Sequence, residues 1–93
     1  MAKVNGTTLT LALPNKMRAH YRVYIGNYNM EALDNLQGEY LVGVVSSGTN
    51  KIIELRTPHQ NITSFEWNGS SLVATLTTSS YYMMLAQPVF YEL

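Results

Sequence analysis

Strict alternation of side chains over residues 16–25 is the feature that most constrains the fold of this chain. In the segment KMRAHYRVYI the odd positions are apolar, and the even positions are basic or, at Tyr24, aromatic. Successive side chains of an extended strand point to opposite faces, so a period of two gives the strand one apolar and one basic face. A helix would distribute both sets around its circumference. We therefore predict a half-buried β-strand here.

Turn residues divide most of the remaining chain into short segments with a strand pattern. These segments lie at residues 7–13, 39–46, 51–57, 62–67, 70–77 and 81–86, with 89–93 as a candidate for a short last strand. Short connections between strands favour antiparallel pairing. We predict one domain over residues 1–93, an all-β antiparallel sandwich or small barrel of about seven strands.

Two hairpins are predicted from their turn residues. Asn68-Gly69 is the preferred pair for a two-residue turn, and it would place Trp67 opposite Ser70. Pro14-Asn15 is predicted to join the first two strands into an antiparallel pair, because proline ends a strand and the pair suits a tight turn.

One short helix is expected at about residues 30–37. Asn29 is a suitable cap before the helix, and Gly38 a suitable stop after it. A helix of this length is marginal alone in water, so its stability would depend on packing against the strands.

Composition limits the classes of protein to which the chain can belong. Apolar residues make up 46% of its 93 residues and charged residues 13%, which favours a packed core over disorder. Equal numbers of acidic and of Lys and Arg residues leave no net charge to attract nucleic acid or anionic membranes. Without cysteine there is neither a disulfide nor a thiolate metal site. The sequence lacks the apolar runs of a signal peptide or membrane helix, so we expect no membrane association.

The even-numbered face of the strand at 16–25 is the candidate binding site. Its side chains repeat about every 6.6–6.8 Å, a spacing comparable with the phosphates of an extended single strand. Three interpretations are open: a solvated stripe that prevents edge-to-edge pairing, which we favour, an acidic protein partner, and nucleic acid. The candidate binding residues are Lys16, Arg18, His20, Arg22 and Tyr24.

Three predicted strands carry apolar side chains on both faces. They lie at residues 41–45, 52–53 and 81–86. One face of each would pack in the core, and a partner surface is the simplest cover for the other. The alternative is a barrel end in which both faces are buried within one chain. The predicted interface residues are Val42, Val44, Ile53, Tyr82 and Met84.

Catalysis is not expected, because no set of groups with matched chemical roles is evident. His20 lies among arginines, and His59 lies in a turn without the spacing of a metal site. The glycines are scattered and form no phosphate-binding loop. We expect no enzyme activity, no metal and no cofactor.

The sequence favours a non-enzymatic structural or accessory subunit that acts by protein–protein association, either as a homo-oligomer or with other protein subunits. A short chain without cysteine, rich in Thr, Tyr and Asn, resembles small phage virion or accessory proteins. The expected location is the cytoplasm, or the virion if the protein is viral. The alternative is a module that binds single-stranded nucleic acid or an acidic protein through residues 16–24, with nucleic acid the less favoured of these partners.

Overall fold

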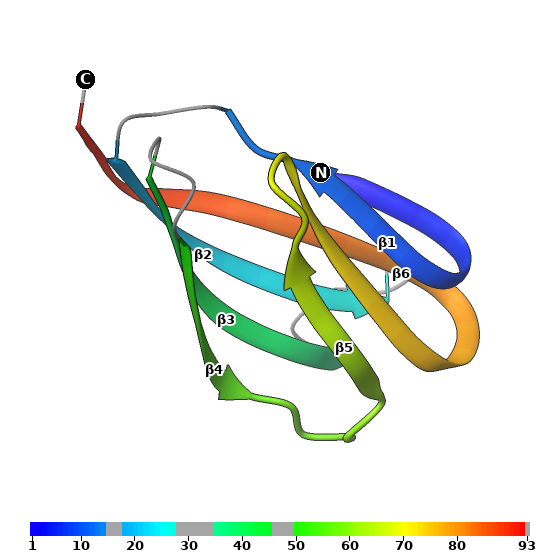
Figure 1. Ribbon diagram of the computed structural model, residues 1–93. Helices are drawn as coiled ribbons and strands as arrows, with labels where there is room; N and C mark the ends of the chain where they lie inside the picture. Colours follow the sequence, from blue (N-terminus) through cyan, green and yellow to red (C-terminus); the bar gives the residue numbers. More distant parts are fainter. Residues whose placement is uncertain (15–17, 28–34, 46–49, 93) are drawn as a thin grey trace.

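The computed structural model describes residues 1–14, 18–27, 35–45 and 50–92 (Figure 1). Within them the chain is all-β and forms one antiparallel sheet, with no helix. The strands are β1 (Ala2–Ala12), β2 (Arg18–Asn27), β3 (Leu36–Val45), β4 (Asn50–Arg56), β5 (Ile62–Trp67) and β6 (Ser71–Glu92). The all-β antiparallel prediction is confirmed.

The long strand β6 pairs with β1, β2 and β5 and so connects the two parts of the sheet. The strand order is β1-β6-β2-β3-β4, and β5 also pairs with β6. The first part of β6 lies between β1 and β5, and its last part pairs with β2. Strands β2, β3 and β4 follow one another as a meander.

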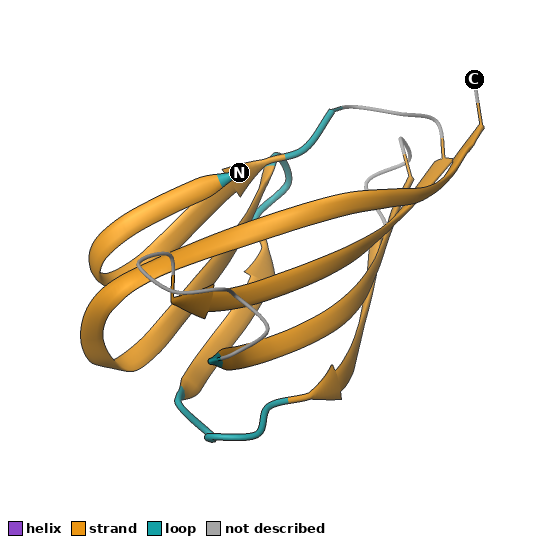
Figure 2. Cartoon of the chain, turned by 180° about the vertical axis from the view of Figure 1, so that it is seen from behind, coloured by secondary structure: helices purple, strands orange, loops and turns teal. Residues whose placement is uncertain are grey.

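Strands β1 and β6 bend together, and the sheet folds over on itself. Gly6 pairs with Ser80 but Thr8 pairs with Thr75, so residues 76–79 of β6 lie opposite Thr7 alone. The extra residues give β6 the longer path that it needs around the bend, as a bulge does on a smaller scale. Figures 1 and 2 show this bent sheet from opposite sides, with its two ends facing each other.

The core lies between the two facing ends of the sheet. The odd positions of β2 are buried in it, as the alternation at residues 18–25 predicts. Tyr40 of β3 stacks on Phe65 of β5, with ring centroids 4.0 Å apart, and so joins the two ends. The buried cluster contains Leu9, Ala19, Tyr21, Val23, Ile25, Tyr40, Val42, Val44, Leu72, Ala74, Leu76, Tyr82 and Met84.

Two predictions of local structure differ from the fold. The predicted hairpin of the first two strands is wrong, because β6 lies between β1 and β2 and pairs with both. The predicted helix is not confirmed: Asn35 is in a turn and Leu36 begins β3, while residues 28–34 lie outside the described residues.

The count of about seven strands is also corrected, to six in the described chain. The segments predicted at 70–77, 81–86 and 89–93 form the single strand β6. Pro88 does not end β6, because it lies beside a bulge: Tyr21 pairs with Pro88 and His20 with Phe90, which leaves Val89 unpaired in the register. Among the described strands, β6 beyond Met84 pairs with β2 only, so the ladder tolerates the missing N–H.

The hairpin of β5 and β6 forms with a register two residues from the predicted one. Trp67 pairs with Leu72 rather than Ser70. The backbone N–H of Asn68 donates to the carbonyl oxygen of Ser71 at the end of the ladder. Asn68 Oδ1 accepts hydrogen bonds from the N–H groups of Ser70 (3.1 Å) and Ser71 (2.8 Å). Gly69 has a φ of 102°, which glycine adopts readily. Because the shift is by two, each side chain stays on its predicted face.

Two glycines of β3 are expected to respond differently to substitution by alanine. A Cβ at Gly38 would meet Ile62 and approach Tyr40 Cε2 to 2.9 Å, and Tyr40 is held by its stack on Phe65. A Cβ at Gly43 would meet His20 Cδ2 at 3.7 Å, an ordinary contact. We expect Gly38→Ala to lower the free energy of unfolding by about 1–2 kcal/mol, and Gly43→Ala to change it by less than about 0.5 kcal/mol. Urea unfolding of both variants tests this, and equal losses would contradict it.

Candidate functional site

The surface of β2, β3, β4 and the last part of β6 that points away from the core is the candidate functional site, and we call it the outer face. Its members are neighbours in the register: Arg22 pairs with Leu41, which pairs with Ile53. In the next row His20 lies between Gly43 and Phe90, and Gly43 pairs with Lys51. The outer face comprises Arg18, His20, Arg22, Tyr24, Glu39, Leu41, Gly43, Lys51, Ile53, Arg56, Val89 and Phe90.

A hollow of about 420 Å³ lies on the outer face. Gly43 is at its floor, because its missing side chain leaves space between His20 and Lys51. Leu41, Ile53 and Val89 line the hollow with apolar groups. The hollow is thus apolar, with basic side chains on two sides.

Large apolar side chains around this hollow are exposed to solvent. Ile53 is 46% exposed, Val89 57% and Phe90 45%. The ring of Phe90 lies 5.3 Å from that of His20, tilted by 45°, so Phe90 packs beside a residue that lines the hollow. Apolar groups gathered in this way are typical of a contact surface.

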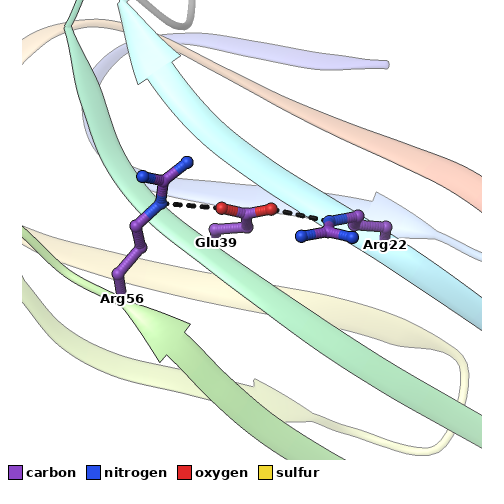
Figure 3. Close-up of polar contacts among 3 residues, drawn as sticks. All are labelled: Arg22, Glu39 and Arg56. Carbon is purple, nitrogen blue, oxygen red and sulfur yellow. Dashed lines mark hydrogen bonds and ion pairs between the residues drawn. The ribbon is translucent and has the colours of Figure 1, made fainter.

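Glu39 lies between two arginines on the same face (Figure 3). Arg22 Nε donates to Glu39 Oε2 at 2.6 Å, and Arg56 Nε donates to Oε1 at 2.8 Å. The arrangement follows from the sheet, because β3 lies between β2 and β4 and its side chains at this point meet those of both neighbours. The Glu39 side chain is buried, whereas those of Arg22 and Arg56 are 44% and 62% exposed.

The charges of this triad support one another. Burial raises the pKa of Glu39, but the hydrogen bonds and charges of Arg22 and Arg56 outweigh it and bring the pKa below its ordinary value. The hydrogen bond to Glu39, with its charge, raises the pKa of Arg22. The triad therefore carries two positive charges and one negative charge at neutral pH, and it fixes the direction of both guanidinium groups.

The predicted binding residues lie together on the outer face as far as they are described. Arg18 and His20 are exposed, and Arg22 and Tyr24 are half-buried. Lys16 lies outside the described residues. Arg22 differs from the prediction in one respect, because its Nε is committed to Glu39 within the same chain.

The predicted interface residues divide between the core and the outer face. Ile53 lies on the outer face. Val42, Val44, Tyr82 and Met84 belong to the buried cluster of the chain itself, although Val42 also lines the hollow. The strands predicted to carry apolar side chains on both faces do present apolar groups outward, but at the positions between the predicted residues, such as Leu41.

Sequence reasoning missed the side chains that β4 and β6 add to the outer face. These are Lys51 and Arg56 from β4, and Val89 and Phe90 from β6. Lys51 and Ile53 share a face by simple alternation, which is a usable signal. That this face lies beside the basic stripe of β2 depends on strand order, which no local pattern gives.

The described part of the chain holds neither a metal-binding cluster nor a membrane-spanning helix. No group of three or more His, Cys, Asp or Glu residues there is placed to hold a metal ion. No helix there is long and apolar enough to cross a membrane.

No protein-family model matches the sequence, and comparisons with curated proteins and with solved structures found no significant match.

Proposed function

We propose that this protein is a non-enzymatic structural or accessory subunit that acts by protein–protein association, and that the outer face is its contact surface. The observation that carries the proposal is the exposure of Ile53 and Val89 in one apolar hollow, with exposed Phe90 packed beside its His20. Each square ångström of apolar surface removed from water contributes about 25 cal/mol. Such a patch is stabilised when a partner covers it.

The shape and charge of the outer face suit an apolar anchor with acidic neighbours. An apolar side chain of the partner would fill the hollow above Gly43, and the surrounding side chains would exclude water from it. Glu39 holds the guanidinium groups of Arg22 and Arg56 in place, and each keeps N–H groups besides the Nε donor. Because these groups are already ordered, pairing with carboxylates of the partner costs little conformational entropy.

Molar mass in solution tests self-association through this face. We expect size-exclusion chromatography with light scattering to give a mass that rises with protein concentration at both low and high salt. Ile53→Glu should give a monomer, because it places a carboxylate beside the hollow. Leu55→Glu is the matched control: Leu55 is an exposed residue of the same strand that does not line the hollow. A monomeric wild-type protein at every concentration, or equal effects of the two variants, would contradict self-association through the hollow.

The second candidate function is binding of an acidic partner, either single-stranded nucleic acid or an acidic protein. Lys51 lies across Gly43 from His20, and Arg56 lies across Glu39 from Arg22. This placement favours such binding, since the basic side chains extend from β2 to β4. Binding of this kind would weaken steeply as salt rises, unlike an apolar contact. Fluorescence anisotropy of a labelled oligonucleotide, with Lys51→Glu as the variant, distinguishes the two functions. No salt-sensitive binding would rule out nucleic acid.

The setting that we propose is a larger assembly such as a phage virion, which the composition of the chain supports. For the fold, we propose that the sheet is best described as a sandwich or small barrel. The bend of β1 and β6 over a shared core supports this description.

A further inference from the structure

A second hollow, of about 450 Å³, lies at the bend of β6, and we call it the polar pocket. The end of β2, the start of β3, the segment before β5 and the bend of β6 form its walls. Its lining includes none of the residues named on the outer face. Asn27, Gln37 and Tyr82 line it although each is more than nine-tenths buried.

Side-chain amides of the polar pocket are joined in one hydrogen-bond network. Asn35 Nδ2 donates to Asn27 Oδ1 at 2.9 Å, and Gln37 Nε2 donates to Asn35 Oδ1 at 3.2 Å. Asn61 Nδ2 donates to Gln37 Oε1 at 3.1 Å and to Tyr82 Oη at 2.9 Å. The network fixes the orientation of each amide, so the polar groups are ordered without a ligand.

The bend of β6 completes this network. Tyr82 Oη donates to the carbonyl oxygen of Thr78 at 2.7 Å, and Asn27 Nδ2 donates to Ser80 Oγ at 3.1 Å. In these contacts Asn27 and Asn35 each use one of the two N–H groups of their amide. Exposed Ser79 also lines the pocket and takes part in none of these bonds.

The chemistry of the lining selects a class of ligand. Among the described residues that line the pocket there is no Asp, Glu, Lys or Arg. An ionic ligand would find no carboxylate, ammonium or guanidinium group among these described residues, and an apolar ligand would cover amides without replacing their bonds to water. A neutral ligand with several hydroxyl groups matches amides and hydroxyls, because both partners donate and accept. The exposed imidazole of His59 at the pocket adds a flat surface for a sugar ring.

We propose that the polar pocket binds a neutral saccharide, with one sugar unit over Asn27 and Asn35. This proposal does not depend on association through the outer face. A network that only stabilises the bend would hold the same amides in place but would take no ligand, so ligand binding separates the two roles.

The test is an NMR titration of the whole chain, labelled with nitrogen-15, with maltotetraose, cellotetraose and chitotetraose, each raised to tens of millimolar. We expect at least one of them to shift the side-chain amide signals of Asn27, Asn35 and Gln37 in a saturable way, with weak affinity because the pocket is open to solvent. Ser79→Glu should weaken this binding by about tenfold or more, because its longer carboxylate side chain occupies the opening. Thr10→Glu, the same change in charge at an exposed site on β1, should leave the binding unchanged.

Three results would overturn the proposal. The first is the absence of a saturable shift with all three sugars. The second is a shift that Ser79→Glu and Thr10→Glu affect equally, since the sugar would then bind elsewhere. The third is saturable binding of inorganic phosphate at the same amides with higher affinity than any sugar, which would assign the pocket to anions.

Discussion

Replacing Leu72 with alanine is expected to lower the free energy of unfolding by about 2–5 kcal/mol. Leu72 is fully buried, and in the ladders of β6 it lies between Leu11 of β1 and Trp67 of β5. With a strand on each side, the backbone has little freedom to close the cavity that the smaller side chain leaves. In a domain of this size each kcal/mol corresponds to a fall of about 4–8 °C in Tm.

Urea unfolding followed by circular dichroism measures this loss. Leu55→Ala is the control, because it removes the same atoms from an exposed position and should change the free energy of unfolding by less than about 0.5 kcal/mol. A loss below about 1 kcal/mol for Leu72→Ala would mean that this site is not close-packed, and would contradict a core between the two ends of the sheet.

Glu39→Gln is expected to have the second large effect, a loss of about 3 kcal/mol at neutral pH. Glutamine keeps the shape of the side chain, but it carries no charge and must point its NH₂ group at one of the two guanidinium groups. The arginines that remain are partly exposed, so water compensates some of the lost pairing. This places the expected loss at the lower end of the range for a broken buried ion pair.

The pH dependence of this loss follows from the pKa of Glu39. In the folded protein that pKa is lowered from its ordinary value of 4.5. A carboxylate whose pKa falls on folding stabilises the folded state above its unfolded pKa, and the contribution is lost as pH falls through the folded pKa. The difference between wild type and Glu39→Gln should therefore be full at pH 7 and should shrink below about pH 4.5.

Urea unfolding of both proteins at a series of pH values tests this dependence. Glu66→Gln serves as the control, since it makes the same substitution at an exposed carboxylate of β5. A difference between wild type and Glu39→Gln that grows on acidification would contradict the assigned direction of the pKa shift.

Local sequence patterns predict a strand well where a single pattern, such as the alternation of apolar and polar side chains, runs along the whole strand. The alternation in β2 gives both its extended form and its buried face, because the two faces meet different surroundings. The hairpin at Asn68 and Gly69 was also predictable, although its register was not. The side-chain oxygen of Asn68 accepts hydrogen bonds from two backbone N–H groups of the turn, and this interaction places the turn one residue later in the chain than predicted.

Strand order and the continuity of β6 were not predictable from these patterns. Thr77, Thr78, Ser79 and Ser80 have the composition of a loop, yet they form the bend of one strand, held by Asn61 and Asn27. The insertion of β6 between β1 and β2 depends on contacts between residues far apart in the sequence, as in the pairing of Val4 with Tyr82, 78 positions away.

The candidate site was predictable only in the part that one strand supplies. Arg18, His20 and Arg22 were placed on one face by alternation alone. The hollow needs Gly43 beside His20, and this pairing belongs to two strands. The burial of Glu39 was also hidden, because an acidic residue is expected at the surface unless its cationic partners are known.

The pairing of β1 has a consequence for the order in which the fold is completed. Among the described strands β1 pairs with β6 alone, so the first of these strands to be synthesised is matched only by the last of them. Strands β2, β3 and β4 can form their meander from neighbours in the sequence, whereas the ladder of β1 is complete only after β6 has been synthesised as far as Met84. Until then the backbone N–H and C=O groups of β1 lack their partners, and the apolar side chains at the odd positions of β2 stay exposed. The nascent chain then depends on its own solubility or on a chaperone.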